Sequence, residues 1–432
     1  MIADVVAAMV PRLEALLGRE SVSVADTDRY AVDGVVPRVM ARPGDAEQVA
    51  AVLRLCAEGG AAVVPWGGGT AIEVGNPPRA ADVVLRTDRL AAVIEHDHAN
   101  LTVTVQAGMS LGALDRALAA QRQFLPLEPP AAELATAGGA IAVNLNGPRR
   151  ARYGSARDFV IGIRTAQTDG AVVKAGGKTV KNVAGYDMGR LYVGSLGTLA
   201  IITEITFKLT PRPEMSRTIA VWSADAPRVM ALAEQIFASV LVPSAVVFVN
   251  RAAAHRLGAT TAGLLVRAEG VEPSVARHER DIAAWAAGTA SEVHVIEGER
   301  EVSLWTAVRD FAWRDAAAVR LSVRPGRTKA LVEGLGAQLP AASAAIADMA
   351  TGTLWAALET ADEVAPALTA MEAALARLGG HLLLARAPRS VKAGRDVWAP
   401  LPDPRVLDVM RALKRAFDPR ATLNPGRYIA GL

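Results

Sequence analysis

The sequence is poor in the residues that most often build metal, disulfide or iron–sulfur sites. Its 432 residues include one cysteine and six histidines, and the histidines are scattered along the chain. One cysteine cannot form a disulfide within the chain, and scattered histidines are more typical of ordinary positions than of metal ligands. We therefore expect no metal site and no iron–sulfur cluster held by this chain.

Long apolar runs are missing as well. The longest uncharged stretches, such as residues 235–250 with Pro243 inside, fall short of the roughly 20 apolar residues that a membrane-spanning helix needs. Charge of one sign is not in excess either, because 47 basic residues face 44 acidic ones. The near balance and the absence of a basic run argue against a surface built for nucleic acid.

The apolar N-terminal segment lacks the basic start of a signal peptide. Val6, Met9, Leu13 and Leu16 fall on one face of a helix, which predicts a helix that docks on the protein. Cys56 lies on the apolar side of a second helical pattern and is expected to be buried. Together these features predict a cytoplasmic protein.

What the chain does have is two glycine-bearing stretches, at residues 65–70 and 138–144. Three successive glycines in the first stretch let several backbone N–H groups point at one anion with no Cβ in the way. A dinucleotide fingerprint is not matched, because Ile72 stands where its third glycine belongs, and a Walker A loop is not matched, because Val172 stands where its first glycine belongs. Taken alone, the first stretch is more typical of a plain tight turn.

The order of apolar patterns predicts an α+β fold. We expect a strand, a helix and a strand before the first glycine stretch, then short strands and helices up to two prolines near residue 212. Beyond residue 213, alanine-rich helical patterns alternate with strand patterns in two similar halves of one helix-covered sheet. The predicted parts are residues 1–212 in two subdomains with a boundary near 95–105, residues 213–400 as a cap, and residues 401–432 as a helix and tail that returns to the first part.

Three of the seven lysines lie close together at Lys174, Lys178 and Lys181. A solvated loop and a contact with a ligand or another subunit are equally compatible with this group.

Five motifs occur in order along the chain, and together they resemble one family. They are PWGGGT, TAGGAIAVNLNG followed by RYG, KNVAGYD, GSLGTLAIITEITFKL and FDPRATLNPGR. In this order they resemble the FAD-binding domain shared by vanillyl-alcohol oxidase, p-cresol methylhydroxylase and D-lactate dehydrogenases, and most of all the FAD-binding subunit of bacterial glycolate oxidases. The resemblance covers residues 37–212 densely and returns at 413–428.

The resemblance implies a two-subdomain FAD-binding domain and assigns FAD contacts residue by residue. The first glycine stretch would hold the diphosphate, the second would line the flavin, and the later segments would edge the cofactor from the other side. The implied contacts are Pro65, Trp66, Gly67, Gly68, Gly69, Thr70, Thr136, Gly138, Gly139, Asn144, Gly147, Gly197, Thr198, Ile201, Ile202 and Asn424. Relatives that attach the flavin covalently use a histidine or a cysteine near these loops, and this chain has neither there, so non-covalent FAD is expected.

The resemblance also implies oxidation of a 2-hydroxy acid to a 2-oxo acid, with the chain as the FAD-binding subunit of a glycolate oxidase complex. A larger FAD-binding subunit and an iron–sulfur subunit would be its partners, and any membrane association would pass through them. D-lactate dehydrogenase relatives carry a His-x-Gly-Asp-Gly-Asn-x-His block, whereas His381 here is followed by Leu-Leu-Leu-Ala-Arg, so no catalytic base is assigned. Two alternatives stay open: a non-catalytic electron-relay flavoprotein and a stand-alone D-2-hydroxy acid dehydrogenase.

Overall fold

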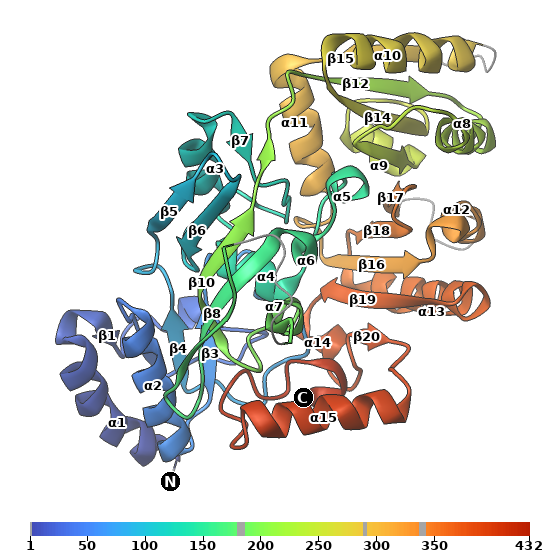
Figure 1. Cartoon of the computed structure of the whole chain (residues 1–432). Helices are drawn as coiled ribbons and strands as arrows, with labels where there is room; N and C mark the ends of the chain where they lie inside the picture. Colours follow the sequence, from blue (N-terminus) through green and yellow to red (C-terminus); the bar gives the residue numbers. More distant parts are fainter. Residues whose placement is uncertain (1, 179–185, 288–291, 337–342) are drawn as a thin grey trace.

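The computed structural model describes residues 2–178, 186–287, 292–336 and 343–432. Figure 1 shows the first half of the chain on the left, a large sheet with its helices on the right, and the C-terminal helix along the bottom. Lys181 and most of the KNVAGYD motif lie outside the described residues. The mixture of helices and sheets confirms the predicted α+β class.

The first sheet has the order β1-β2-β4-β3 and is built around parallel pairs. Its strands are β1 (Val22–Ser23), β2 (Val39–Ala41), β3 (Val63–Trp66) and β4 (Val83–Arg86). Helices α1 (Ile2–Leu17) and α2 (Ala46–Gly59) pack on each other, and Cys56 is fully buried in their shared core. The docking face of α1 is as predicted except at its end, where Leu17 is buried and Leu16 only partly so.

The second sheet has the order β5-β6-β10-β8-β9 and is antiparallel throughout. Its strands are β5 (Val93–Asp97), β6 (Thr102–Gln106), β8 (Val160–Ala166), β9 (Val172–Gly176) and β10 (Ile201–Lys208), while β7 (Gln123–Phe124) and β11 (Thr210–Pro211) form a separate pair. The helices of this part are α3 (Leu111–Ala119), α4 (Ala137–Val143), α5 (Arg150–Tyr153), α6 (Ala156–Phe159) and α7 (Met188–Tyr192).

The third sheet holds nine strands, and every neighbouring pair is antiparallel. Its strands are β12 (Met215–Trp222), β13 (Ala245–Val249), β14 (Gly263–Gly270), β15 (Glu292–Ile296), β16 (Ala317–Val323), β17 (Ala344–Asp348), β18 (Thr353–Leu358), β19 (Gly380–Arg386) and β20 (Trp398–Ala399). The order β15-β12-β14-β13 in its first half is the mirror of β17-β18-β16-β19 in its second half. The two halves meet where β13 pairs with β17, which agrees with the two similar halves predicted from the sequence.

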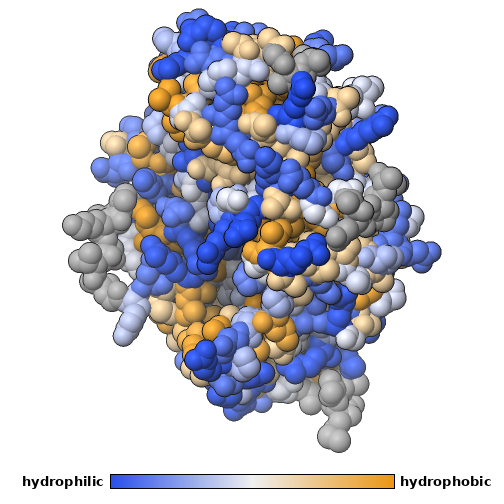
Figure 2. Space-filling view, turned by 90° about the vertical axis from the view of Figure 1, so that its right-hand side faces the viewer, coloured by the Kyte–Doolittle hydropathy of each residue, from blue (hydrophilic) through white to orange (hydrophobic). Residues whose placement is uncertain are grey.

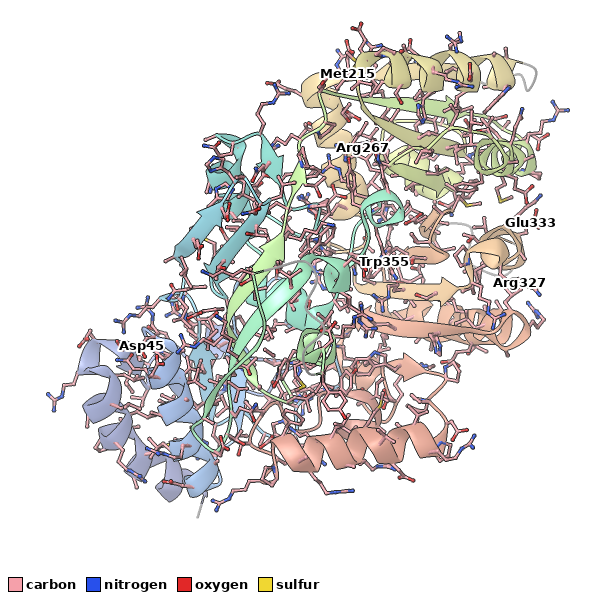
Figure 3. All side chains as sticks on the ribbon, viewed as in Figure 1. Asp45, Met215, Arg267, Arg327, Glu333 and Trp355 are labelled. Atoms are coloured by element: carbon pink, nitrogen blue, oxygen red, sulfur yellow. The ribbon has the colours of Figure 1, made fainter. Side chains whose placement is uncertain are left out.

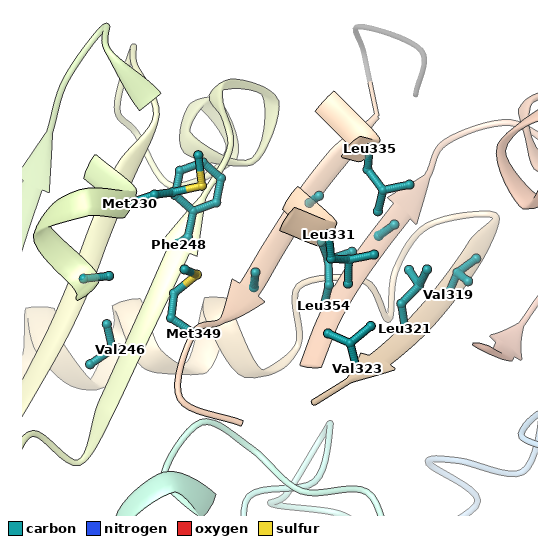
Figure 4. Packing of buried hydrophobic residues seen from close by; sticks show 14 of the residues in the cluster. Met230, Val246, Phe248, Val319, Leu321, Val323, Leu331, Leu335, Met349 and Leu354 are labelled. Carbon is teal, nitrogen blue, oxygen red and sulfur yellow. The ribbon is translucent and has the colours of Figure 1, made fainter. Parts of the chain in front are cut away.

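The two faces of this sheet are covered differently. Helices α8 (Ala226–Ala238), α10 (Glu272–Ala287), α12 (Thr328–Gly336) and α13 (Ala361–Leu378) bury an apolar core on one face, part of which Figure 4 shows from close by. On the other face, α9 (Arg251–Arg256) and α11 (Gly298–Arg309) cover a smaller apolar cluster. The outer side of this unit, turned to the viewer in Figure 2, is mostly hydrophilic with scattered hydrophobic residues.

The C-terminal segment returns to the first sheet. After α14 (Arg389–Lys392) the chain forms α15 (Pro404–Phe417), and Leu423 then lies beside Val63 of β3 in a parallel bridge. Lys414 anchors the return, because its buried ammonium contacts the Asp418 carboxylate at 2.6 Å and donates to the carbonyls of Thr198 and Leu423. The tail thus lies where the sequence predicted it.

Candidate functional site

A cavity with about 920 Å³ of space, including its open mouth, lies where both glycine stretches and the C-terminal tail meet. Residues 65–72 form one wall, α4 and its flanks form another, and Leu196 to Ile202 with Asn424 and Arg427 close it from the side. Segments that lie more than 300 residues apart in the sequence therefore build one hollow. We call it the first cavity.

Most of the residues implied by the sequence resemblance lie on its surface. Those that line it are Pro65, Trp66, Gly67, Gly68, Gly69, Thr70, Thr136, Gly138, Gly139, Gly197, Ile201, Ile202 and Asn424. Asn144 and Gly147 line a different cavity, described below. Thr198 lines neither cavity, and its hydroxyl donates to the Ser195 carbonyl at 2.7 Å.

The glycines of the first stretch are needed for two separate reasons. Gly69 has a φ of +71°, in the left-handed region that favours glycine. Gly67 and Gly68 do not, but a Cβ on Gly67 would lie 2.2 Å from Thr136 Oγ1, and one on Gly68 would lie 2.0 Å from the Leu134 carbonyl oxygen. The sequence interpretation that all three glycines simply make room for an anion is therefore incomplete, because two of them let the loop pack on the segment before α4.

Backbone donors are available along this loop. Within the described part of the chain, the N–H groups of residues 67–71 donate no hydrogen bond to another protein group. Buried or partly buried N–H groups are rarely left without an acceptor, so a row of free donors on a cavity wall is suited to an anionic ligand.

The start of α4 is fixed by a cap and by close packing. Thr136 accepts a hydrogen bond from the Gly139 N–H at 3.2 Å, and the Gly138 N–H donates to the Ala107 carbonyl at 2.7 Å. A Cβ on Gly138 would lie 2.7 Å from the Cβ of Ala107, so this glycine lets the helix approach β6 (Thr102–Gln106) and its following turn.

The tail brings two polar side chains with unused hydrogen-bonding atoms. Asn424 donates through Nδ2 to the Leu196 carbonyl at 2.6 Å, while its buried Oδ1 has no partner among the described residues. Arg427 donates through Nη2 to the carbonyls of Ile72 and Val74, while its buried Nε and Nη1 have no hydrogen-bond partner in the described part of the chain. Burial lowers the pKa of Arg427 to about 10. Arg427 was not among the predicted contacts, although it ends the last of the five motifs.

A second cavity, with about 1290 Å³ of space including its mouth, lies between the first half of the chain and the nine-stranded sheet. The two cavities share walls: Pro129 lines the first and Glu128 and Pro130 the second, and likewise Val143 lines the first and Asn144 the second. Trp313, which lines the second cavity, donates through Nε1 to the carbonyl of Thr70 at 2.8 Å. A ligand bound in the second cavity would therefore lie next to a ligand bound in the first cavity.

The sheet side of the second cavity is formed by two rows of paired residues. Ile346, Trp355 and Arg320 make one row across β17, β18 and β16, and Asp348, Thr353 and Ser322 make the next. Figure 3 labels Trp355 and, farther up the same boundary, Arg267. Burial raises the pKa of Asp348 to about 6, and its carboxylate accepts from the Thr351 hydroxyl and from two backbone N–H groups of the β17–β18 turn.

Other predicted features fall away from these cavities. Lys178 is exposed and pairs with Glu95, which agrees with the solvated-loop interpretation, and His381 is exposed at the start of β19. Over the described ranges, no group of three or more histidine, cysteine, aspartate and glutamate side chains is arranged to hold a metal ion. No helix in the described part of the chain is long and apolar enough to cross a membrane.

Comparison with known proteins agrees with this geometry. The family model described as "FAD binding domain" matches residues 37–176. Glycolate oxidase subunit GlcD of Bacillus subtilis (strain 168) is 29% identical over 421 residues, which cover 91% of this chain and 89% of that protein. Glycolate oxidase subunit GlcE of Escherichia coli (strain K12) is 42% identical over 147 residues, which cover 34% of this chain and 41% of that protein.

A solved structure extends the agreement to the whole fold. p-Cresol methylhydroxylase with substrate bound superposes with a TM-score of 0.72 at 16% sequence identity, covering 98% of this chain and 96% of that one. The matched segment, the matched fold and the cavity between the glycine stretches point to one conclusion: the chain carries an FAD-binding domain over residues 37–176, its fold is like that of p-cresol methylhydroxylase, and its cofactor is FAD.

Proposed function

We propose that this chain is the FAD-binding subunit of a complex that oxidises a small 2-hydroxy acid, such as glycolate, to the 2-oxo acid. The observation that carries the proposal is the first cavity, whose walls come from both glycine stretches and from the tail. Relatives that are glycolate oxidase subunits, one of them alignable over 91% of this chain, support the choice of reaction.

The residues of the first cavity fit a dinucleotide. Free N–H groups at residues 67–71 suit the diphosphate, because backbone donors bind phosphate oxygens without a side chain. Asn424 Oδ1 offers an acceptor, and Arg427 offers unused donors for polar edges of the cofactor. Among the described residues no histidine or cysteine lines this cavity, which supports non-covalent binding. Of the other implied contacts, Asn144 and Gly147 would act from the shared wall, and Thr198 by holding its loop.

In this reaction the substrate loses one hydrogen together with two electrons from its hydroxyl-bearing carbon, and one proton from its hydroxyl oxygen. FAD supplies the oxidant, and the chain's own residues must position the substrate and exclude water. The described residues offer no histidine at the cavities for a base, so the activity of the chain alone is expected to be low.

Partners complete the proposal. A larger FAD-binding subunit and an iron–sulfur subunit would provide the remaining catalytic groups and carry electrons onward, since this chain has a single, buried cysteine. We propose a cytoplasmic location in which any membrane contact is made by those partners. We also propose the division into residues 1–212, 213–400 and 401–432, which is supported by the separate sheets and the returning tail.

The test starts with the visible spectrum of the purified chain. We expect stoichiometric FAD that is released on denaturation, slow reduction of a dye by glycolate or D-lactate, and faster reduction after co-expression with the two partners. Gly68→Ala should lose FAD per folded molecule, whereas Gly334→Ala, at a helical glycine with open space around its Cβ position, should keep it. A folded protein without flavin absorbance would contradict the proposal, and fast turnover by the single chain would contradict the need for partners.

A further inference from the structure

The second cavity is lined by two arginines that form no ion pair with the described residues. Arg320 lies on β16 (Ala317–Val323), in the middle of the sheet side, and Arg150 lies opposite on α5 (Arg150–Tyr153). Neither side chain makes a hydrogen bond or an ion pair with the described residues. Arg150 is exposed to solvent, whereas the Nε of Arg320 is fully buried without a partner. A guanidinium removed from water without an acceptor is costly, so its presence at a cavity suggests that a ligand provides the acceptor.

The remaining charged groups that face this cavity are already engaged. Glu128 pairs with Arg149 at 3.0 Å, and Arg309 pairs with Asp310 at 2.9 Å. Asp348 is hydrogen-bonded to the turn that follows it and makes no ion pair with the described residues. With Asp348 ionised, the unpaired charge of the cavity is therefore one positive unit, from two arginines and one carboxylate.

The position of the cavity connects this charge to the proposed reaction. Pro129 and Val143 line the first cavity, and the residues that follow them, Pro130 and Asn144, line the second, so the cavity that contains Arg320 lies beside the FAD site. Trp313 and Trp355 meet edge to face at 5.5 Å and form an apolar wall, while Ser322 and Thr353 add two hydroxyls. This set of groups suits a molecule with one carboxylate and a small polar remainder.

We propose that the second cavity is the substrate site and that Arg320 and Arg150 bind the single carboxylate of a small monocarboxylic 2-hydroxy acid, in preference to a dicarboxylic one. The assignment rests on the proposed function and deepens it. One carboxylate satisfies the planar donors of Arg320 and cancels the net charge of the cavity. A second carboxylate would remain near Asp348 without a cation, and burying an unpaired charge is unfavourable.

Asp348 sets the pH dependence of this site. Besides Asp348, the ionisable groups on the cavity walls are Glu128, Arg150, Arg309 and Arg320. Since the pKa of Asp348 is raised to about 6, its negative charge is lost as the pH falls through that range. Anion binding should therefore tighten between pH 8 and pH 5.5, and discrimination against dicarboxylates should weaken over the same interval.

The experiment measures binding of non-oxidisable probes to the FAD-loaded full chain by calorimetry, with the flavin spectrum as a second signal. Methoxyacetate serves as the monoanion, malonate as the dianion and methoxyacetamide as the neutral analogue. We expect methoxyacetate to bind most tightly at pH 8 and to shift the flavin spectrum. Arg320→Met should weaken it about 10- to 100-fold, and Arg320→Lys less, because charge remains but the fork is lost.

Controls separate the site from general charge effects. Arg327→Met removes an exposed arginine on the short helix after β16, seen at the outer edge of the sheet in Figure 3, and should leave binding unchanged. Asp348→Asn should tighten binding at pH 8 and abolish its dependence on pH. If Arg320→Met does not fold, Arg150→Met provides the second test of the same carboxylate contact.

The outcomes distinguish this inference from the proposed function. Normal FAD content with no methoxyacetate binding, equal binding by folded Arg320→Met, or tighter binding of malonate at pH 8 would overturn the inference alone. A chain that lacks FAD yet binds methoxyacetate through Arg320 would support the anion site and overturn the proposed function.

Discussion

Arg149 and Arg150 are neighbours in the sequence, but they belong to two regions with opposite electrostatics. Arg149 enters a cluster in which Glu128, Glu269 and Glu301 surround Arg149 and Arg267, and it contacts Glu269 at 2.6 Å. Arg150 instead faces the second cavity with Arg320, where no carboxylate pairs with either guanidinium among the described residues. We call these regions the paired cluster and the unpaired site.

The buried carboxylates of the two regions shift in opposite directions. Burial alone would raise the pKa of Glu269, but Arg149 and Arg267 hold it below its ordinary value. Burial raises the pKa of Asp348, and its hydrogen bonds and the distant charge of Arg150 do not reverse this. Glu269 is therefore stabilised as an anion by the fold, whereas Asp348 is destabilised as one.

The difference shows how to distinguish structural arginines from binding arginines. The paired cluster joins Glu128 and Arg149, from the first half of the chain, to Arg267, Glu269 and Glu301 of the sheet unit, so its charges are satisfied by folding itself. The unpaired site lies at the same boundary, but there folding supplies no ion-pair partner among the described residues, and the Nε of Arg320 is buried without an acceptor. Substitutions in the two regions should therefore change the free energy of unfolding by different amounts and in opposite directions.

The largest effect is expected from Arg149→Met. Removing this arginine leaves Glu269, whose side chain is fully buried, without its closest cation, and breaking a buried pair in this way costs about 3–5 kcal/mol. Urea denaturation followed by circular dichroism measures the loss. Arg405→Met, which removes a 90% exposed partner of Asp403, should leave stability nearly unchanged, because solvent screens an exposed ion pair. Equal losses in both variants would contradict the contrast.

The second prediction concerns acid stability. Because the folded pKa of Glu269 is lowered, its contribution is present above its ordinary pKa and is lost as the pH falls through the folded value. Each pKa unit between the folded and the unfolded value changes the free energy of unfolding by about 1.4 kcal/mol. We expect the urea concentration at the midpoint of unfolding to decrease as the pH falls below about 4.5. In Glu269→Gln this midpoint should depend less steeply on pH. An identical slope in that variant would place the acid sensitivity elsewhere.

The sequence predicted the regions whose chemistry is local. Gly67 to Thr70 and Thr136 to Gly139 are short glycine-bearing segments, so their patterns alone placed them at turns and a helix start, and the resemblance added FAD. The resemblance predicted that Asn424 lies at the FAD site, but its hydrogen bond to the Leu196 carbonyl is a tertiary contact that only the folded structure shows. Neighbouring residues of one segment line different cavities: Val143 lines the first and Asn144 the second. Nothing in the sequence indicates this division.

The unpaired site could not be predicted from the sequence, because it is defined by two arginines that have no ion-pair partner among the described residues. Arg320 lies in an ordinary strand pattern, and Asp348 precedes an ordinary turn. Only the register of β16, β17 and β18 places them in adjacent rows on one face of the sheet. Likewise, nothing in the adjacent letters of Arg149 and Arg150 shows that one is paired and the other is not.

The third prediction is that Asp348→Asn stabilises the protein above pH 6. The folded pKa of Asp348 lies above its ordinary value of 3.8, so the stability that the neutral acid provides is lost as the pH rises from about 4 through about 6. Asparagine keeps an acceptor for the turn without the charge. We expect a gain of about 1 kcal/mol at pH 8 and no gain at pH 4. Destabilisation at both pH values would show that the turn requires the carboxylate.

The smallest effect is expected from Arg320→Met, which sharpens the comparison because the same substitution at Arg149 should be the most damaging. Among the described residues, Arg320 makes no ion pair that the change could break, and burial already opposes its charge, lowering its pKa to about 10. Methionine fills a comparable volume beside Trp355 and needs no acceptor. We expect the free energy of unfolding to change by no more than about 0.5 kcal/mol, or to rise, in the absence of substrate. Added methoxyacetate should then raise the unfolding midpoint of the unsubstituted protein but not that of the variant, since a ligand stabilises only the state that binds it. A loss above about 2 kcal/mol without ligand would make Arg320 a structural residue like Arg149 and remove the distinction between the two regions.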